Sequence, residues 1–213
     1  MYALGLDRRL GLEFKGEGKP KIPSDFESDE LALPWMFFGY GMSFTPLQLL
    51  SMYNAIANDG VMIRPRFVER LEVMGKTTEQ IETEVLYSPI CSEPTLAQLR
   101  HILYQVVAHE EGTAHNIYSD QLSMAGKTGT CQLNYWSRDN GLEYQASFVG
   151  YFPAENPEYS CIVVINKPRQ NGYYGSTVAA PVFEKIAHGT RRLTPLPPDH
   201  LPKTDIPIKA LHI

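Results

Sequence analysis

The chain of 213 residues is long enough to form one domain that buries about 70% of the surface exposed by its unfolded chain. Apolar residues make up 43% and charged residues 20% of the sequence, which excludes a wholly disordered protein. The net charge of −5, with no basic stripe, argues against a nucleic-acid partner.

The three cysteines, at 91, 131 and 161, lie far apart in the sequence. Their spacing matches no metal-binding pattern, and an odd number cannot complete a disulfide framework, so we expect buried or half-buried thiols. No apolar run reaches the roughly 18 residues needed to cross a bilayer, and the N-terminus carries no signal segment. Taken alone the chain is predicted to be soluble and cytoplasmic. As a piece of a longer protein it indicates no location.

The first 60 residues contain one strong helix signal. An apolar start closed by Gly5 predicts the end of a helix, residues 11–30 predict a long loop, and residues 37–41 predict a tight apolar turn. Residues 46–58 predict a helix, because Thr45 can cap it, Pro46 suits its first position and apolar residues follow at helical spacing. Residues 61–73 alternate loosely, which indicates a strand edge or an extended connection.

The second half of the chain predicts a small sheet between helices. A helix is expected over 94–108, then strands over about 123–133, 145–152 and 160–166, and a last helix over about 176–189. Asp139-Asn140-Gly141 is a strong hairpin signal between the first two strands. The order predicts an α+β fold with three consecutive antiparallel strands whose edges need covering. The proline-rich residues 193–213 predict an extended or disordered tail.

The first predicted strand carries the sequence Lys127-Thr128-Gly129-Thr130. Alternation puts Lys127 and Gly129 on one face and the two threonines on the other. A glycine inside a strand often marks the close approach of a ligand or of another backbone, so a peptide could add to this strand. The alternative is an ordinary surface strand with an extended lysine and a bulge at the glycine.

The surrounding segments resemble, nearly end to end, the C-terminal part of the transpeptidase domain of class B, division-type penicillin-binding proteins. A Lys-Thr-Gly strand is one of three motifs that build the active site of such proteins and of serine β-lactamases. The other segments that carry the resemblance, in family order, are Leu4-Gly5-Leu6 with Gly11-Leu12, Phe38-Gly39-Tyr40-Gly41 with Thr45-Pro46-Leu47-Gln48, Asn58-Asp59-Gly60 with Arg64-Pro65, Glu111-Gly112-Thr113-Ala114, Asn166-Lys167-Pro168, Tyr173-Tyr174-Gly175 and Ala180-Pro181-Val182-Phe183.

The resemblance implies a serine enzyme that cross-links peptidoglycan stem peptides and is inhibited by β-lactams. Its nucleophile and base come from Ser-x-x-Lys and a second serine from Ser-x-Asn, and neither motif occurs here. Both would precede Met1 by family order, together with two N-terminal strands of the sheet. Three roles carry over: Lys127 polarises the serines, Thr128 and Thr130 bind the substrate carboxylate, and the Thr130 N–H is one oxyanion-hole donor. No cofactor or metal is implied.

Other chemistry-bearing residues carry weaker signals. His109-Glu110-Glu111 is not a metalloprotease motif because Thr113 follows, and we expect His101, His109 and His115 to be hydrogen-bonded or solvated. The serines at 137, 147 and 176 lack a nucleophile-elbow sequence. Tyr135-Trp136 and Tyr173-Tyr174 could rim a peptide groove or pack at strand ends.

The sequence therefore predicts a fragment of a D,D-transpeptidase, with residues 1–192 as the C-terminal portion of the domain. The fragment itself would be inactive, and its unpaired sheet edges predict marginal stability or association. The resemblance places the parent in the bacterial cytoplasmic membrane with this domain outside, beside division or elongation membrane proteins, and implies no nucleic-acid partner. The alternative is a non-catalytic peptide-binding or interaction module of the same fold.

Overall fold

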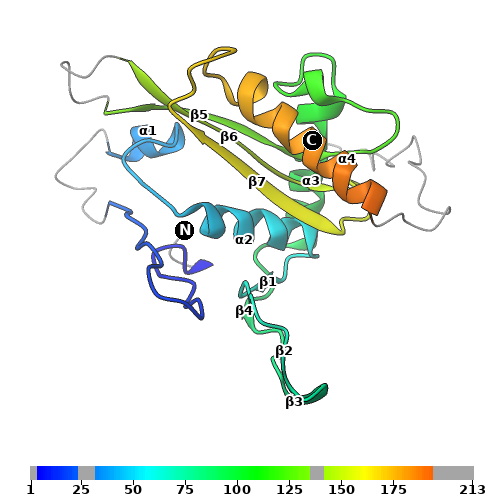
Figure 1. Cartoon of the computed structure of the whole chain (residues 1–213). Coiled ribbons are helices and arrows are strands. Elements are labelled where there is room, and N and C mark those ends of the chain that lie inside the picture. The colour runs from blue at the N-terminus through cyan, green and yellow to red at the C-terminus, as the bar shows by residue number, and fades with distance from the viewer. Residues whose placement is uncertain (1–3, 24–31, 135–141, 194–213) are drawn as a thin grey trace.

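The computed structural model describes residues 4–23, 32–134 and 142–193, and its centre is a three-stranded antiparallel sheet. The strands are β5 (Ala125–Leu133), β6 (Glu143–Phe152) and β7 (Tyr159–Asn166), in the spatial order β5-β6-β7 (Figure 1). The register runs without a shift from Ala125 opposite Tyr151 to Leu133 opposite Glu143. The α+β fold with three consecutive antiparallel strands is the one that the sequence predicts.

Helices cover both faces of this sheet because the apolar side chains of its strands alternate between two cores. On one face, Phe148 packs against Phe183 of α4 (Ala180–Leu193), with ring centroids 4.8 Å apart. On the other face, Ala125 and Tyr151 belong to a cluster with residues of α2 (Pro46–Ala57) and α3 (Glu93–Ala108). Figure 1 shows α4 and α2 on opposite sides of the strands. The sheet therefore contributes to a core on each of its faces.

Local signals explain where the main helices begin. Thr45 and Gln48 form a reciprocal capping box at the start of α2, as the sequence predicts from Thr45 and Pro46. The last helix begins with a π-helical turn, η3 (Gly175–Ala179), which leads directly into α4. A short 3₁₀ helix, η2 (His115–Ile117), joins α3 to β5.

The N-terminal part packs against α2 through a third, smaller core that contains Leu6, Leu10, Ala55 and Met62. Gly5 lies in a turn with φ of +63°. A short helix, α1 (Ala32–Phe37), occupies a stretch where the sequence predicts only a loop and an apolar turn. It carries no buried residue, so the periodic pattern that identifies a packed helix is missing from it.

A second hairpin extends away from the rest of the molecule. A short sheet of β1 (Met62–Ile63) and β4 (Val85–Tyr87) leads into β2 (Arg70–Val73) and β3 (Lys76–Gln80), which pair antiparallel (Figure 1). We call residues 69–81 the arm, because the Ile81 amide donates to the Glu69 carbonyl at its base. Every residue of β2 and β3 is exposed.

The arm is the main departure from the sequence prediction. The loose alternation over 61–73 gives only β1 and β2, and β3 and β4 were not predicted. The hairpin signal at 139–141, the aromatic pair at 135–136 and the tail after Leu193 lie outside the described residues. Of the helices that the structure describes, none is both long enough and apolar enough to cross a bilayer.

Candidate functional site

The Lys-Thr-Gly-Thr sequence lies in the middle of β5, which is an edge strand of the central sheet. Thr128 is in register with Phe148, so the Thr128 side chain shares the face covered by α4. Lys127 is in register with Val149 and shares the face of Tyr151, toward α2 and α3. The structure thus has Lys127 and Gly129 on one face and the threonines on the other, as alternation predicts.

The main-chain groups of Thr130 point to the outer edge of β5, where no described strand pairs with it. Two contacts mark this edge: the Gln132 amide donates to the Tyr40 hydroxyl at 3.3 Å, and the Thr128 carbonyl accepts from the Lys127 ammonium at 3.0 Å. In an antiparallel pair, alternate residues direct both N–H and C=O away from the partner strand. Thr130 lies between Thr128 and Gln132 in this alternation, so its N–H and C=O face the same open edge.

The Lys127 ammonium folds back over Thr128, where it also lies 3.4 Å from the hydroxyl oxygen Oγ1. That hydroxyl is in turn 3.1 Å from the hydroxyl of Thr113, in the loop that follows α3. Lys127, Thr113 and Thr130 are exposed and Thr128 is half-buried. The edge therefore presents one positive charge and two hydroxyls that are hydrogen-bonded to each other, beside a main-chain donor and acceptor with which no described strand pairs.

The backbone of Gly175 lies directly on the α4 face of this strand. Its amide donates to the Thr130 hydroxyl at 3.0 Å, which fixes the rotamer of that side chain. A Cβ at Gly175 would lie 2.4 Å from the Ser147 carbonyl and 2.6 Å from the Gly129 carbonyl. Only a residue without a side chain fits there, so the start of η3 is held against the motif.

Gly129 has a packing reason of its own. A Cβ there would lie 2.4 Å from Oγ of Ser147, its register partner on β6. The pairing of β5 with β6 has no shift at this point, so the alternative of a bulge glycine is wrong. At the motif β5 is therefore a regular strand that lies close to Ser147 and to the Gly175 backbone.

Sequence reasoning assigned no role to Thr113, Tyr40 or Gly175, although each lies in a segment that carries the family resemblance. Tyr40 closes the end of the open edge at Gln132, and its ring lies against Trp35 of α1 at 5.7 Å. Thr113 follows Gly112, whose added Cβ would lie 2.4 Å from the Val106 carbonyl at the end of α3. For Thr113 and Gly175 the available signal was a glycine, because Gly112 and Gly175 each lie where two backbones meet.

Among the described residues, no serine hydroxyl is hydrogen-bonded to a lysine or a histidine. Ser123, the serine nearest in sequence to Lys127, is buried, donates to a carboxylate oxygen of Glu155 and accepts the Ala154 amide at 2.9 Å. Ser147 packs behind Gly129, and Ser176 lies in η3. Ser137 lies outside the described residues. Ser123 is therefore buried and held by structural hydrogen bonds, and it is not a candidate nucleophile.

The tyrosines at 173 and 174 form a stacked group with Tyr144. The rings of Tyr144 and Tyr173 lie 4.0 Å apart and nearly parallel, and the Tyr173 hydroxyl donates to that of Tyr174. This hydrogen bond raises the pKa of Tyr174, whose side chain is 53% exposed. The group joins the start of β6 to the chain before η3. The rings therefore pack at the end of a strand, which is one of the two alternatives that the sequence left open, and Tyr174 stays accessible.

His109, His115 and the three cysteines have ordinary surroundings. The His115 Nδ1 lies 3.1 Å from the Val107 carbonyl, and His109 accepts the Glu111 amide. The three cysteines are free and half-buried, as predicted, and burial raises the pKa of Cys131 and Cys161. Within the described ranges, no group of three or more His, Cys, Asp or Glu side chains is placed to hold a metal ion.

An edge strand with a lysine, two threonine hydroxyls and free main-chain groups matches the family that the motifs indicate. The family model of the penicillin binding protein transpeptidase domain matches residues 1–188. The chain therefore belongs to the penicillin-binding protein transpeptidase family, and the predicted resemblance to class B domains is confirmed.

Similar proteins come from several bacteria. Penicillin-binding protein PbpB of Mycobacterium tuberculosis is 32% identical over 207 residues, which cover 92% of this chain and 30% of that protein. Stage V sporulation protein D of Bacillus subtilis is 29% identical over 183 residues, covering 85% and 28%. The probable peptidoglycan D,D-transpeptidase PenA of Neisseria gonorrhoeae is 29% identical over 198 residues, covering 92% and 32%.

Solved structures agree with this assignment. Penicillin binding protein 3 of Mycobacterium tuberculosis in its apo form has a TM-score of 0.77 and 30% identity, covering 92% of this chain and 46% of that one. The corresponding domain of Burkholderia pseudomallei penicillin-binding protein 3 has a TM-score of 0.74 and 26% identity, covering 93% and 57%. The chain thus spans about a third of the length of the curated relatives named above.

Proposed function

We propose that this chain is the substrate-strand portion of a peptidoglycan D,D-transpeptidase. The observation that carries the proposal is the open edge of β5, where Thr130 directs its N–H and C=O outward beside the Lys127 ammonium. An extended stem peptide would add to this edge as a further strand, held by main-chain hydrogen bonds. PenA of Neisseria gonorrhoeae, a relative, is named as a probable peptidoglycan D,D-transpeptidase.

Each motif residue has a role that follows from its position. The outward N–H of Thr130 would donate to the oxyanion that develops on the scissile carbonyl. The Thr130 hydroxyl, fixed by the Gly175 amide, and the Thr128 hydroxyl, bonded to Thr113, would bind the substrate carboxylate. The Lys127 ammonium would hold the reacting serine hydroxyls and stabilise the negative charge of the intermediate.

The nucleophile would come from a segment of the parent protein outside this chain. The family reaction needs a serine activated by a lysine, and no serine here has lysine three residues later. In the proposed reaction that serine attacks the penultimate D-alanine carbonyl, releases D-alanine and passes the acyl group to an amine. The 213-residue chain would form no acyl-enzyme by itself.

The surroundings of the parent follow from the same assignment. β-Lactams would acylate the parent, and one similar structure is penicillin binding protein 3 of Mycobacterium tuberculosis complexed with aztreonam. The domain would act on the outer side of the bacterial cytoplasmic membrane, with division or elongation membrane proteins as partners.

A second candidate is a non-catalytic module that binds peptides on the same strand. The absence of Ser-x-x-Lys from this sequence favours it, since an open edge can bind without a nucleophile. The two candidates differ in whether the parent protein forms a covalent adduct.

The deciding experiment labels the parent protein with a fluorescent penicillin and measures the acylation rate. Lys127→Ala removes the charge and the donor, so acylation should fall by about 10²–10³-fold, the typical effect of losing one electrostatic contact to the developing oxyanion. Lys127→Arg keeps the charge but not the compact ammonium, so its acylation rate should fall less than that of Lys127→Ala. Lys185→Ala, at an exposed position on α4, is the matched control and should acylate at the normal rate.

Intact-mass analysis of the 213-residue chain after incubation with penicillin should show no added mass. A stoichiometric adduct on this chain would contradict the assignment of the nucleophile to another segment. A parent that folds but takes no penicillin, while the chain binds D-Ala-D-Ala peptides, would favour the non-catalytic module.

A further inference from the structure

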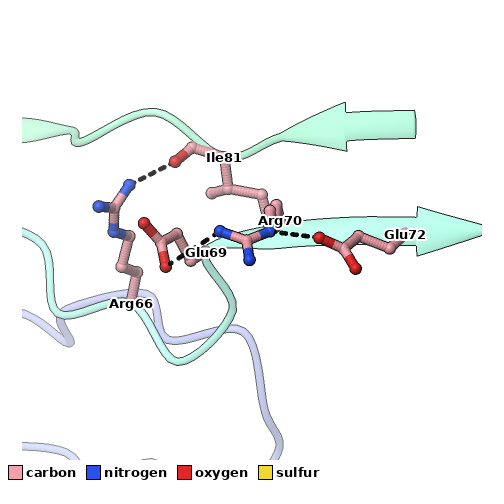
Figure 2. Close-up of polar contacts among 5 residues, drawn as sticks. All are labelled: Arg66, Glu69, Arg70, Glu72 and Ile81. Carbon is pink, nitrogen blue, oxygen red and sulfur yellow. Dashed lines mark hydrogen bonds and ion pairs between the residues drawn. The ribbon is translucent and has the colours of Figure 1, made fainter. Parts of the chain in front are cut away.

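The base of the arm is closed by contacts between its two sides and touches the N-terminal loop through one pair of rings. The Arg66 guanidinium donates to the Ile81 carbonyl (Figure 2). This hydrogen bond links the chain before β2 to the chain after β3. Just before it, Arg64 pairs with Glu84 at 2.7 Å, and the Phe67 ring packs edge-on against Phe14 at 4.8 Å. The two arginine contacts join the two sides of the hairpin, and the ring pair joins its base to the N-terminal loop.

The turn at the tip of the arm holds an apolar residue in an unfavourable backbone conformation, although that residue is not buried. Met74 and Gly75 form the two-residue turn between β2 and β3, with φ of +50° and +76°. Such turns favour Asn-Gly or Gly-Gly, because positive φ is unfavourable for a bulky side chain. Met74 is nevertheless 100% exposed. A strained apolar residue that packs against nothing in its own chain suggests a contact outside it.

The two faces of the arm differ in how their charges are satisfied. On one face, Arg70 pairs with Glu72 at 2.5 Å and reaches back to Glu69 at 3.9 Å, as Figure 2 shows. On the other face, Lys76 and Glu79 make no ion pair with any described residue. The charges of the first face form ion pairs within the chain, and those of the second face do not.

We call this second face the docking face; its members are Leu71, Val73, Lys76 and Glu79. Leu71 is opposite Glu79 on the lower rung, and Val73 is opposite Lys76 on the rung nearer the tip. Leu71 is 47% and Val73 58% exposed. Each rung thus joins one apolar side chain on β2 to one charged side chain on β3, and the two charges are opposite.

We propose that the docking face binds the docking face of a second copy of this chain. Two arms laid face to face and antiparallel, about a twofold axis perpendicular to the strands, place Leu71 over Val73 and Lys76 over Glu79 of the other copy. The symmetry makes each contact twice, as in any isologous interface. The arrangement covers both apolar side chains and pairs both free charges, while Met74 extends the apolar contact at the tip.

The pattern fits a second copy better than a lipid surface. Acidic residues outnumber basic ones in the arm, three (Glu69, Glu72, Glu79) to two (Arg70, Lys76), which disfavours an anionic bilayer. The contact is small, so the dimer is weak and concentration-dependent, in the range of transient interfaces. The proposal is independent of the transpeptidase assignment, since it uses no residue of β5.

The test measures the dimer dissociation constant of the 213-residue chain by sedimentation velocity over a concentration series. Lys76→Glu and Glu79→Lys each bring like charges together at two places in the dimer, so each should weaken association about tenfold. The double variant restores opposite charges and should return to within about threefold of the starting chain. Val73→Thr keeps the strand preference but removes apolar contact, and should also weaken the dimer.

The matched control swaps the charges of the opposite face. Arg70→Glu combined with Glu72→Arg preserves the internal ion pair and leaves the docking face unchanged, so its dissociation constant should not change. Met74→Asn relieves the positive φ at the tip and should weaken association several-fold, which a purely structural role for Met74 would not produce. Circular dichroism confirms that each variant is folded.

Three results would overturn the proposal. The first is a chain that stays monomeric at every concentration. The second is association that ignores all docking-face substitutions, which would place the contact elsewhere, for example on the sheet edges. The third is weakening by both single swaps without recovery in the double variant, which would mean that the docking face binds a different surface of its partner.

Discussion

The two antiparallel hairpins of this molecule show opposite uses of the same secondary structure. In β5–β6 the strands are covered on both faces, and Ala125, Ala146, Phe148 and Tyr151 are fully buried. In β2–β3 every residue is exposed, and a single ion-pair chain runs along one face. A two-stranded hairpin is only marginally stable in water by itself. The first hairpin is therefore held by its cores, and the second by contacts at its base.

The difference bears on function as well as stability. The buried hairpin keeps β5 straight and in register, so that the motif edge has a fixed geometry. The arm contributes little to the core, and its sequence is free to carry side chains that act on something else. Substitutions should therefore have large effects on stability in β5–β6 and small ones in the arm.

The strongest test of this difference in stability replaces one apolar strand residue in each hairpin by alanine. Phe148→Ala removes a fully buried ring that contacts Phe183, and should lower the free energy of unfolding by about 4 kcal/mol. Leu71→Ala, in the arm, should change it by less than about 0.5 kcal/mol. Urea unfolding at concentrations where the chain is monomeric measures both. Equal losses at the two sites would show that the arm is part of the cooperative core.

A smaller effect tests how tightly the central sheet is closed to water. The Tyr151 hydroxyl is buried and has no hydrogen-bond partner among the described residues. Removing an unsatisfied buried hydroxyl should stabilise the fold, so Tyr151→Phe should raise the free energy of unfolding by about 1 kcal/mol at neutral pH. Tyr144→Phe, at a half-buried position on the same strand, serves as the control and should change little.

The same variant gives a pH dependence. Burial raises the pKa of Tyr151 to about 12, against an opposing effect of the Arg100 charge, whereas an unfolded tyrosine titrates near pH 10. The folded state holds this proton more tightly, so its stabilisation is complete below about pH 10 and is lost as pH rises toward 12. The starting chain should lose stability in this window, and Tyr151→Phe should lack that part of the loss. Parallel curves for the two proteins would contradict burial of the hydroxyl.

The smallest expected effect is kinetic and compares thiols in the two regions. Burial raises the pKa of Cys131 and Cys161, so less of each is thiolate at pH 8 and alkylation by iodoacetamide should be slow. Thr77→Cys places a thiol at an exposed position on the arm as the reference. Peptide mapping after timed alkylation should find the arm thiol modified first. Modification of Cys131 at the same rate would indicate that β5 opens readily.

Local sequence signals predicted the elements that form the central sheet and its helices. The capping residues of α2, the helical spacing in α3 and the three strand patterns were sufficient, because each element buries a face and its apolar residues therefore repeat. The arm lacked such a signal. With both faces exposed, β2 and β3 have no buried face to impose alternation, and Met74-Gly75 is not a preferred turn sequence. For the same reason α1, which buries nothing, was predicted as part of a loop.

The candidate site likewise has features that the local sequence predicts and features that depend on tertiary contacts. The sequence by itself determined the family and the motif strand, because Lys127, Thr128, Gly129 and Thr130 are consecutive and the segments that resemble the family stand in order. Only the tertiary structure decided that the Gly175 amide fixes Thr130 and that Tyr40 closes the edge at Gln132. These partners lie 45 and 92 residues away along the chain. Contacts at such separations depend on how the sheet and its covering helices pack, and no local pattern in the sequence records them.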